Sequence, residues 1–424
     1  MPVRQPVKAG LRPHAPKEKP TARITKGKGA QVTGQPAAAS QPETETAGTN
    51  RHLFFLSTAR NLEMLLVQEL ADMGITNADP MAMGVEVPLN QEEVYRVVYN
   101  SRIGSKVLRP IASFPCRTSE ELYEQAYAWN WSAIMKPDQT LKVTASVWDS
   151  SITHSQFAAL KLKDAIVDAL RDQHGIRPSV DRETPDIRLD LHLRKDQARI
   201  SLYYSDGVMH RRGYRKQAVE APLKENLAAA LLRFSGWTPG MRFIDPFCGS
   251  GTFLIEAAML ASRTPAGYFR KVQGFESLPD FDAELWEKVK GESDSARREL
   301  PVGVIQGSDI DARALAATRA NLEATPFAGR IKLIQKDFAR LSGPYADAVL
   351  MANPPYGIRL EDTEEGLGDL YGKLGRFLQD KCRGSRAYVL CPSKAMVESL
   401  GLPLNRSLII DNGAIEIKVG EIVP

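Results

Sequence analysis

The chain has 424 residues, of which 43% are hydrophobic and 25% charged, a composition typical of a globular protein with two or three domains. It contains no run of 18 apolar residues and no hydrophobic segment near its N-terminus, so we expect neither a membrane span nor a secretory signal. Four scattered cysteines and six dispersed histidines favour a reducing, cytoplasmic setting and no metal site.

The net charge of +4 is unevenly distributed along the chain. Residues 1–50 hold eight Lys and Arg against three Asp and Glu, which leaves a net charge of −1 for residues 51–424. This first segment is rich in Pro, Ala, Gly, Gln and Thr and lacks apolar periodicity, so we expect a disordered basic tail. Its composition is compatible both with weak attraction to RNA and with no specific role.

Residues 51–115 alternate short apolar strands with amphipathic helices. The helices are expected over residues 61–73 and 92–101, and strands precede, separate and follow them. This order of strand, helix, strand, helix and strand indicates a small α+β unit of the ferredoxin-like type.

Residues 116–215 predict a second α+β unit. A helix over residues 157–174 is expected to turn Leu160 inward, together with Ile166, Val167 and Leu170. Residues 187–193 alternate strictly between apolar and polar, and residues 197–204 supply the partner strand of a hairpin-like pair.

A basic segment, His210 to Lys216, follows this unit and surrounds one glycine and one tyrosine with five basic side chains. Arginine forks match phosphate oxygens, and a tyrosine ring can stack on a base, so the segment is a candidate RNA contact. The candidate RNA-binding residues are Arg211, Arg212, Tyr214 and Arg215. The alternative is a solvated linker between domains.

Residues 216–424 alternate helices and strands, beginning with a helix expected from Pro222 to Phe234. The expected strands cover residues 242–247, 302–308, 331–336, 346–352 and 387–391. This alternation predicts an α/β fold with a doubly wound, Rossmann-like parallel sheet. Asn412-Gly413 lies between two apolar alternations and predicts an antiparallel C-terminal hairpin, which fits a methyltransferase better than a dinucleotide dehydrogenase.

A glycine-rich loop, Asp245-Pro-Phe-Cys-Gly-Ser-Gly-Thr252, follows the first of these strands and opens a helix. Its glycines allow a ligand to approach the main chain closely, as nucleotide-like cofactors require. The spacing is not G-x-G-x-x-G, and an acid precedes the glycines. Asp245 would repel a pyrophosphate but suits the sulfonium and amino group of S-adenosylmethionine. Cys248 is interpreted as a small buried residue rather than a nucleophile.

Three further acids follow the next two strands. Asp309 can accept both ribose hydroxyls of an adenosyl group, whereas Asp311 more simply caps the following helix. Asp337 ends the third strand, where it is either an acceptor for an adenine amino group or an acid on a surface loop.

Asn353-Pro-Pro-Tyr356 ends the fourth strand, on the same edge of the sheet. The two prolines fix the backbone so that the side-chain carbonyl of Asn353 and the main-chain carbonyl of Pro354 can converge on one amino group. Such an amine is a poor nucleophile because its lone pair is delocalised into the base, and two acceptors stabilise the charge that develops on nitrogen. Tyr356 can stack on an extruded base. The catalytic candidates are Asn353, Pro354, Pro355 and Tyr356.

Several motifs in order resemble the bacterial THUMP-domain RNA methyltransferases, in particular the large-subunit rRNA guanine-N2 methyltransferases. The motifs are His210–Arg215, Ala221–Glu225 with Leu227–Ala230, Asp245–Thr252, Gly307–Asp311 and Asn353–Gly357. The resemblance runs from about Arg51 to the C-terminus and implies ferredoxin-like, THUMP and catalytic domains over residues 51–115, 116–215 and 216–424. The basic tail is outside the family pattern, and larger relatives carry a second methyltransferase domain.

The resemblance also implies that Pro222 to Glu225 helps to close the cofactor pocket. The candidate cofactor-binding residues are Pro222, Glu225, Asp245, Phe247, Cys248, Gly249, Ser250, Gly251, Thr252, Asp309, Ile310, Asp337, Phe338 and Asn353. We therefore predict a monomeric or weakly dimeric enzyme that methylates guanine N2 in 23S rRNA, without a metal. The alternatives are an adenine-N6 enzyme, a tRNA guanine-N2 enzyme, a dinucleotide oxidoreductase, and a non-catalytic RNA-binding or ribosome-assembly factor.

Overall fold

The computed structural model describes residues 51–218, 222–356 and 364–424. The basic tail expected over residues 1–50 therefore lies outside the described residues. Within the described ranges, none of the helices combines the length and the apolar composition that crossing a membrane requires.

The first half of the described chain builds one seven-stranded sheet in the order β2-β3-β1-β4-β7-β6-β5. Its strands are β1 (His52–Ser57), β2 (Asp79–Met81), β3 (Gly84–Leu89), β4 (Lys106–Pro115), β5 (Leu141–Trp148), β6 (Ile187–Arg194) and β7 (Gln197–Tyr203). The ten-residue strand β4 connects the two α+β units, because it pairs with β1 near Val107 and with β7 from Leu108 to Pro115. The two units expected from the sequence thus share a continuous sheet.

Four helices accompany this sheet: α1 (Glu63–Asp72), α2 (Gln91–Asn100), α3 (Ser119–Tyr127) and α4 (Ser155–His174). Helix α2 begins at a capping box formed by Asn90 and Glu93, which satisfies two backbone donors at once. In α4 the prediction for Leu160 is wrong, because its side chain is 50% exposed whereas Leu162 is fully buried. Ile166, Val167 and Leu170 are buried, as expected.

The second half of the chain forms the expected doubly wound sheet, in the order β10-β9-β8-β11-β12-β14-β13. Its strands are β8 (Arg242–Asp245), β9 (Ile305–Asp309), β10 (Lys332–Gln335), β11 (Ala348–Ala352), β12 (Arg386–Cys391), β13 (Arg406–Asn412) and β14 (Ile415–Ile422). The strands from β10 to β12 are parallel, and the C-terminal hairpin pairs antiparallel with β12. Asn412 pairs with Ile415, so the hairpin loop is Gly413–Ala414, one residue later than expected. The strand order reverses between β8 and β11.

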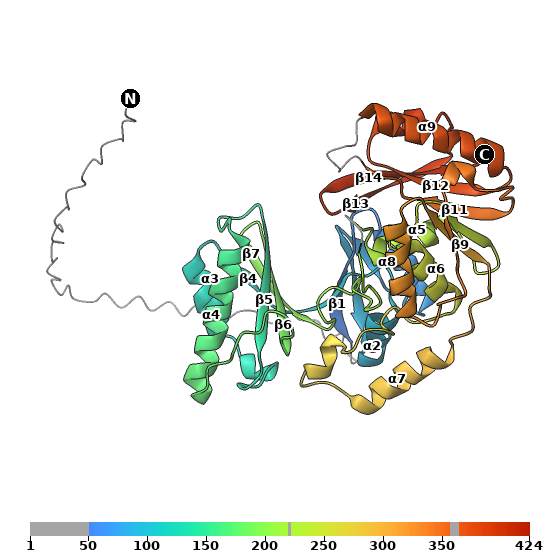
Figure 1. The fold of residues 1–424 in the computed structure, drawn as a ribbon. Helices are drawn as coiled ribbons and strands as arrows, with labels where there is room; N and C mark the ends of the chain where they lie inside the picture. The colour runs from blue at the N-terminus through green and yellow to red at the C-terminus, as the bar shows by residue number, and fades with distance from the viewer. Residues whose placement is uncertain (1–50, 219–221, 357–363) are drawn as a thin grey trace, which may run out of the picture. The chain divides into compact units, whose positions relative to one another are not determined.

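Helices cover both faces of this sheet (Figure 1). The helices in this half of the described chain are α5 (Glu225–Ser235), α6 (Thr252–Ala261), α7 (Ala283–Ser295), α8 (Ala312–Glu323), α9 (Glu364–Lys381) and α10 (Lys394–Ser399), of which α7 lies away from the sheet (Figure 1). Leu227 of α5, Leu254 of α6 and Leu315 of α8 belong to one apolar core, and Leu374 of α9 to another. The prediction that Pro222 starts a helix is wrong, because α5 begins at Glu225.

The insertion between α6 and β9 packs against the ferredoxin-like part of the chain. Trp286 of α7 lies edge-on to Tyr99 of α2, with ring centroids 5.2 Å apart. The main-chain N–H of Gly267 donates to the Tyr99 carbonyl at 2.7 Å, and Arg102 donates to the Thr264 carbonyl at 2.6 Å. The insertion therefore joins the catalytic part of the chain to the first sheet. Three short 3₁₀ turns complete the described structure: η1 (Trp131–Ala133), η2 (Gly274–Ser277) and η3 (Phe338–Arg340).

Candidate active site

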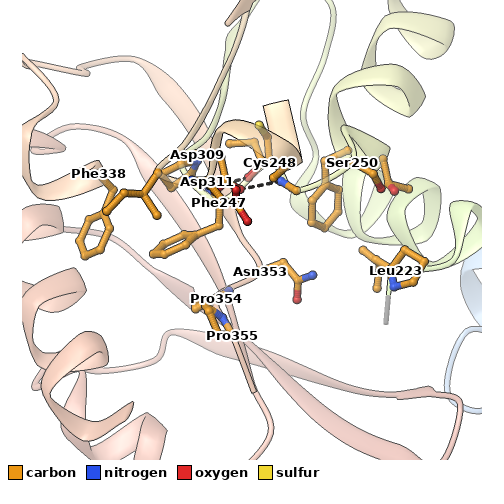
Figure 2. Close-up of a pocket in the computed structure, with 18 of the residues that line it drawn as sticks. Leu223, Phe247, Cys248, Ser250, Asp309, Asp311, Phe338, Asn353, Pro354 and Pro355 are labelled. Carbon is orange, nitrogen blue, oxygen red and sulfur yellow. Dashed lines mark hydrogen bonds between the residues drawn. The ribbon is translucent and has the colours of Figure 1, made fainter. Parts of the chain in front are cut away.

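A cavity of about 370 Å³ lies at the carboxyl ends of the parallel strands, where the strand order reverses. Open α/β sheets bind ligands at such a switch point because the loops diverge there. Asp245 ends β8, Asp309 ends β9, and Asn353 follows β11. Figure 2 shows Asn353, Pro354 and Pro355 on one side of the cavity, opposite Phe247, Cys248 and Asp309.

The glycine-rich loop is held in place by hydrogen bonds from two sides. Gly249 and Gly251 have φ angles of +53° and +84°, which glycine adopts without strain. Asp309 accepts from the Gly249 N–H at 2.9 Å, and the Thr318 hydroxyl donates to the Gly249 carbonyl at 2.7 Å. A side chain at position 251 would also collide with Thr318, since an added Cβ would lie 2.9 Å from its methyl carbon. The loop is thus fixed before any ligand binds.

Arg215 ties this loop to the segment that precedes α5. Its Nε donates to Glu225 Oε1 at 2.9 Å, its Nη1 to Ser250 Oγ at 2.9 Å and its Nη2 to Thr252 Oγ1 at 3.0 Å. Its side chain is only 19% exposed. The sequence predicts an RNA contact for Arg215, but in the structure its guanidinium organises the glycine-rich loop.

Two more residues of the basic segment do not face solvent. Arg212 and Tyr214 are each only 1% exposed, and both bond to the buried carboxylate of Glu256, at 3.4 Å and 3.2 Å. The expected stacking of Tyr214 on a base and the expected phosphate contact of Arg212 are therefore corrected, because these side chains are enclosed by protein. Arg211 alone of the four candidates is exposed.

Two of the acids that line the cavity, Asp245 and Asp309, have no basic partner in the described part of the chain. Asp245 is 1% exposed, and burial raises the pKa of its carboxyl group well above the usual value, although the Phe247 N–H donates to it at 3.0 Å. Among the described residues, no Lys or Arg forms an ion pair with Asp245 or Asp309. A positively charged ligand beside Asp245 would favour its ionised form. The residues therefore fit S-adenosylmethionine, which carries a sulfonium and an ammonium group.

The far end of the cavity offers an aromatic and polar surface. The rings of Phe247 and Phe338 lie 4.9 Å apart, and Asp337 caps η3 by accepting from the Ala339 N–H at 3.0 Å. Ile310 is 69% exposed at the cavity's edge. Cys248 is buried, and burial raises the pKa of its thiol, so the group stays protonated and is a poor nucleophile.

The Asn-Pro-Pro-Tyr corner contains a contact that the sequence did not predict. The Tyr356 hydroxyl donates to the side-chain oxygen of Asn353, which fixes the orientation of the amide group. Burial raises the pKa of Tyr356, so its phenol remains a donor. A carbonyl oxygen has two acceptor positions, and one remains for a substrate amine.

All candidate cofactor residues except Glu225 and Gly251 line this cavity, as do the four catalytic candidates. Glu225 instead pairs with Arg215, and Gly251 is turned toward Thr318. Asp311 also lines the cavity and, as expected, caps α8 by accepting from the Arg313 N–H at 2.8 Å. The lining residues that sequence reasoning missed are Leu223, Pro246, Phe253, Asp311, Ala314, Leu370 and Lys373. Apolar helix residues such as Leu370 resemble ordinary core positions in a sequence, so no signal marks them.

A doubly wound sheet closed by an antiparallel hairpin, with these loops at its switch point, defines a class I S-adenosylmethionine-dependent methyltransferase. Three family profiles match the chain in order. They are the RlmL ferredoxin-like domain over residues 53–108, the THUMP domain over 116–203 and the RMKL-like methyltransferase domain over 212–403.

Relatives cover most of the chain. A Synechocystis sp. protein described as a candidate RNA methyltransferase is 35% identical over 374 residues, which are 88% of this chain and 97% of that protein. The ribosomal RNA large subunit methyltransferase K/L of Methylococcus capsulatus is 39% identical over 375 residues, which are 86% of this chain and 50% of that protein. This chain thus spans about half the length of the K/L relatives it matches. The crystal structure of SMU.472, a candidate methyltransferase complexed with SAH, is 26% identical, with a TM-score of 0.78 over 88% of this chain and 98% of that one.

The chain belongs to the THUMP-domain family of S-adenosylmethionine-dependent RNA methyltransferases. This membership confirms the resemblance seen in the sequence and the expected fold class. The boundaries expected at residues 115 and 215 stay predictions.

Replacing Asp309 with Ala should weaken cofactor binding by at least about tenfold, because hydrogen bonds to a charged group contribute about 1.5–3 kcal/mol each. The substitution also removes the acceptor for the Gly249 N–H. Isothermal titration calorimetry with S-adenosylmethionine measures the effect. Asp309→Asn, which keeps one acceptor oxygen, should lose less affinity. An unchanged dissociation constant for Asp309→Ala would remove this residue from the site.

Proposed function

We propose that this protein transfers the methyl group of S-adenosylmethionine to the exocyclic N2 amine of a guanine in 23S rRNA. The observation that carries the proposal is the position of Asn353 and Pro354, which face the glycine-rich loop and its acids across one cavity (Figure 2). Two acceptors at this place can hold the two hydrogens of an amino group, which supports an amine as the methyl acceptor.

The chain's own residues hold the cofactor and shield the reacting groups. Asp309 would accept from the ribose hydroxyls, Phe338 would contact the adenine, and Asp245 would face the positive end of the molecule. When bound there, S-adenosylmethionine supplies an electrophilic methyl group. The segment around Leu223, a residue that is 3% exposed, closes one side of the cavity to water.

Asn353 and Pro354 orient the substrate amine. The free acceptor position of the Asn353 side chain and the Pro354 carbonyl would each take one hydrogen of the amino group. Positive charge that develops on the nitrogen is then stabilised by two fixed dipoles that need no reorganisation. Tyr356 contributes by holding the Asn353 amide, and its ring remains a proposed stacking surface for the base.

Three observations support the choice of substrate. The THUMP domain and the family support RNA rather than DNA. The names of the K/L relatives support large-subunit rRNA, although this chain matches only about half of each of them. Guanine N2 follows from the resemblance of the motifs to the guanine-N2 group of this family, since Asn-Pro-Pro-Tyr suits any exocyclic amine.

The test is transfer of labelled methyl from S-adenosylmethionine to unmodified total RNA, followed by nucleoside digestion and chromatography. We expect N2-methylguanosine in the large rRNA. If N6-methyladenosine appears instead, the mechanism stands and the target is adenine. If the label appears in tRNA, the substrate is tRNA and not rRNA. Failure to label free RNA or an assembling large subunit, despite cofactor binding, would favour a non-catalytic assembly factor.

A further inference from the structure

A second cavity, of about 380 Å³, adjoins the methyltransferase cavity. Both cavities are lined by Pro222 and Leu223, so this short segment forms a shared wall. The rest of the second cavity is lined by residues 210–213, Arg215, Lys224 and Glu225. Lys224 is also the N-cap residue of α5, where the dipole of a helix is positive. We call this space the basic cavity.

The basic cavity holds more positive than negative charge. Four cationic side chains line it, and Glu225 is its one lining carboxylate within the described chain. Arg215 is neutralised by Glu225 at 2.9 Å, and Arg212 by Glu256 at 3.4 Å. Arg211 and Lys224 are exposed. Within the part of the chain that the structure describes, neither forms an ion pair, so two positive charges remain for a ligand.

A residue that lines the same cavity has a buried ring nitrogen without a partner among the described residues. The ring atom Nδ1 of His210 is buried and forms no hydrogen bond with the described residues. Burial and then the nearby cations, Lys224 first, lower the pKa of His210 to about 4, so the ring is neutral at neutral pH. A neutral imidazole carries one N–H donor, and an anionic oxygen in the cavity would satisfy it.

We propose that the basic cavity binds a backbone phosphate of the substrate RNA next to the target nucleotide. Arg211 and Lys224 would neutralise the phosphate, and His210 would donate to one of its oxygens. The shared wall places this phosphate beside the cavity that takes the extruded base. The inference therefore rests on the proposed function. The rival anion is the carboxylate of the cofactor itself. A phosphodiester carries the same single charge as a carboxylate, but Arg211 and Lys224 are exposed, where a polymer that approaches from solvent can reach them, so the phosphodiester is preferred.

The structure supplies a matched control for this proposal. Lys216 lies in the same basic segment and is exposed like Lys224, but its side chain does not line the cavity. The variants Lys224→Gln and Lys216→Gln therefore remove the same charge from two neighbouring positions, and only the first removes it from the cavity. Arg211→Gln and the double variant Arg211→Gln/Lys224→Gln complete the set.

The experiment measures binding of the full chain to unmodified large-subunit rRNA at several potassium chloride concentrations. We expect the double variant to weaken binding by about tenfold at low salt and the slope of log K against log salt to fall by about 0.7–0.9 for one lost phosphate contact. Lys216→Gln should change the affinity less than twofold and leave the slope unaltered. The dissociation constant for S-adenosylmethionine, measured in parallel by calorimetry, should stay within twofold in every variant.

Any other result of the binding measurements overturns the proposal. Equal losses for Lys216→Gln and Lys224→Gln would mean general electrostatic attraction, with no localised site. Weaker S-adenosylmethionine binding in the double variant would assign the cavity to the cofactor carboxylate. Unchanged RNA binding would exclude a phosphate site. Methylation is a separate test, because binding is measured without turnover. If the variants show the expected losses but the wild-type chain methylates no guanine, the proposed reaction is overturned and the phosphate site stands.

Discussion

The variant Asn353→Ala should lose about 100-fold to 1,000-fold in kcat while still binding S-adenosylmethionine. Removing one fixed acceptor from a site of this kind costs about 2.7–4 kcal/mol of transition-state stabilisation. The loss should fall on kcat rather than on cofactor affinity, because Asn353 faces the loop of Asp245 and Cys248 across the cavity and belongs to the part that holds the amine (Figure 2). Single-turnover methyl transfer and calorimetry separate the two effects.

Two variants sharpen this test. Asn353→Asp keeps an oxygen acceptor at the same place, so it should retain more activity than Asn353→Ala. Tyr356→Phe removes the hydroxyl that holds the Asn353 side chain and keeps the ring, so a moderate loss would reflect orientation alone. Turnover near the wild-type rate in Asn353→Ala would contradict the proposed role of this residue.

The variant Arg212→Met should lower the free energy of unfolding by about 3–5 kcal/mol, because it leaves a buried carboxylate without its cation. Arg212 and Glu256 have fully buried side chains, and Arg212 also donates to the carbonyls of Met209, at 2.7 Å, and Arg102. After the substitution, the Tyr214 hydroxyl, which donates to Glu256 Oε1 at 3.2 Å, would be the donor that remains to Glu256 among the described residues. The thermal midpoint followed by circular dichroism measures the change.

A neighbouring residue gives the matched control for stability. Arg211→Met removes the same charge one position earlier from an exposed side chain and should change the free energy of unfolding by less than about 0.5 kcal/mol. The double variant Arg212→Met/Glu256→Leu removes both buried charges, so it should recover much of the stability lost in Arg212→Met. If Arg212→Met melts at the wild-type temperature, the buried ion pair does not contribute to stability as predicted.

Local patterns in the sequence were enough for the fold class and for the position of the cavity. The alternation of strands and helices after Pro222, with a hairpin at its end, can be seen in local sequence patterns and is present in the structure. The motifs that begin at Asp245, Asp309 and Asn353 each end a parallel strand. Parallel strands bring their carboxyl ends to one edge of the sheet, so residues more than a hundred positions apart could be expected at one site.

The burial of the basic segment was decided only by tertiary structure. In the sequence, Arg211, Arg212, Arg215 and Lys216 are equivalent cations around Tyr214. Glu256 lies 44 residues beyond Arg212, and Ser250 lies 35 residues beyond Arg215. A local sequence pattern therefore predicts neither hydrogen-bond partner. The same holds for β4, whose pairing with both β1 and β7 joins two expected units into one sheet.

The sequence by itself therefore determined what each segment can form, and the tertiary structure decided which side chains of a segment meet protein and which meet solvent. The physical reason is that backbone periodicity and turn chemistry act over a few residues, whereas the desolvation of a charge depends on all the chain that packs around it. Arg212 became part of the core and Arg211 stayed at the surface for this reason, although they are neighbours in the sequence.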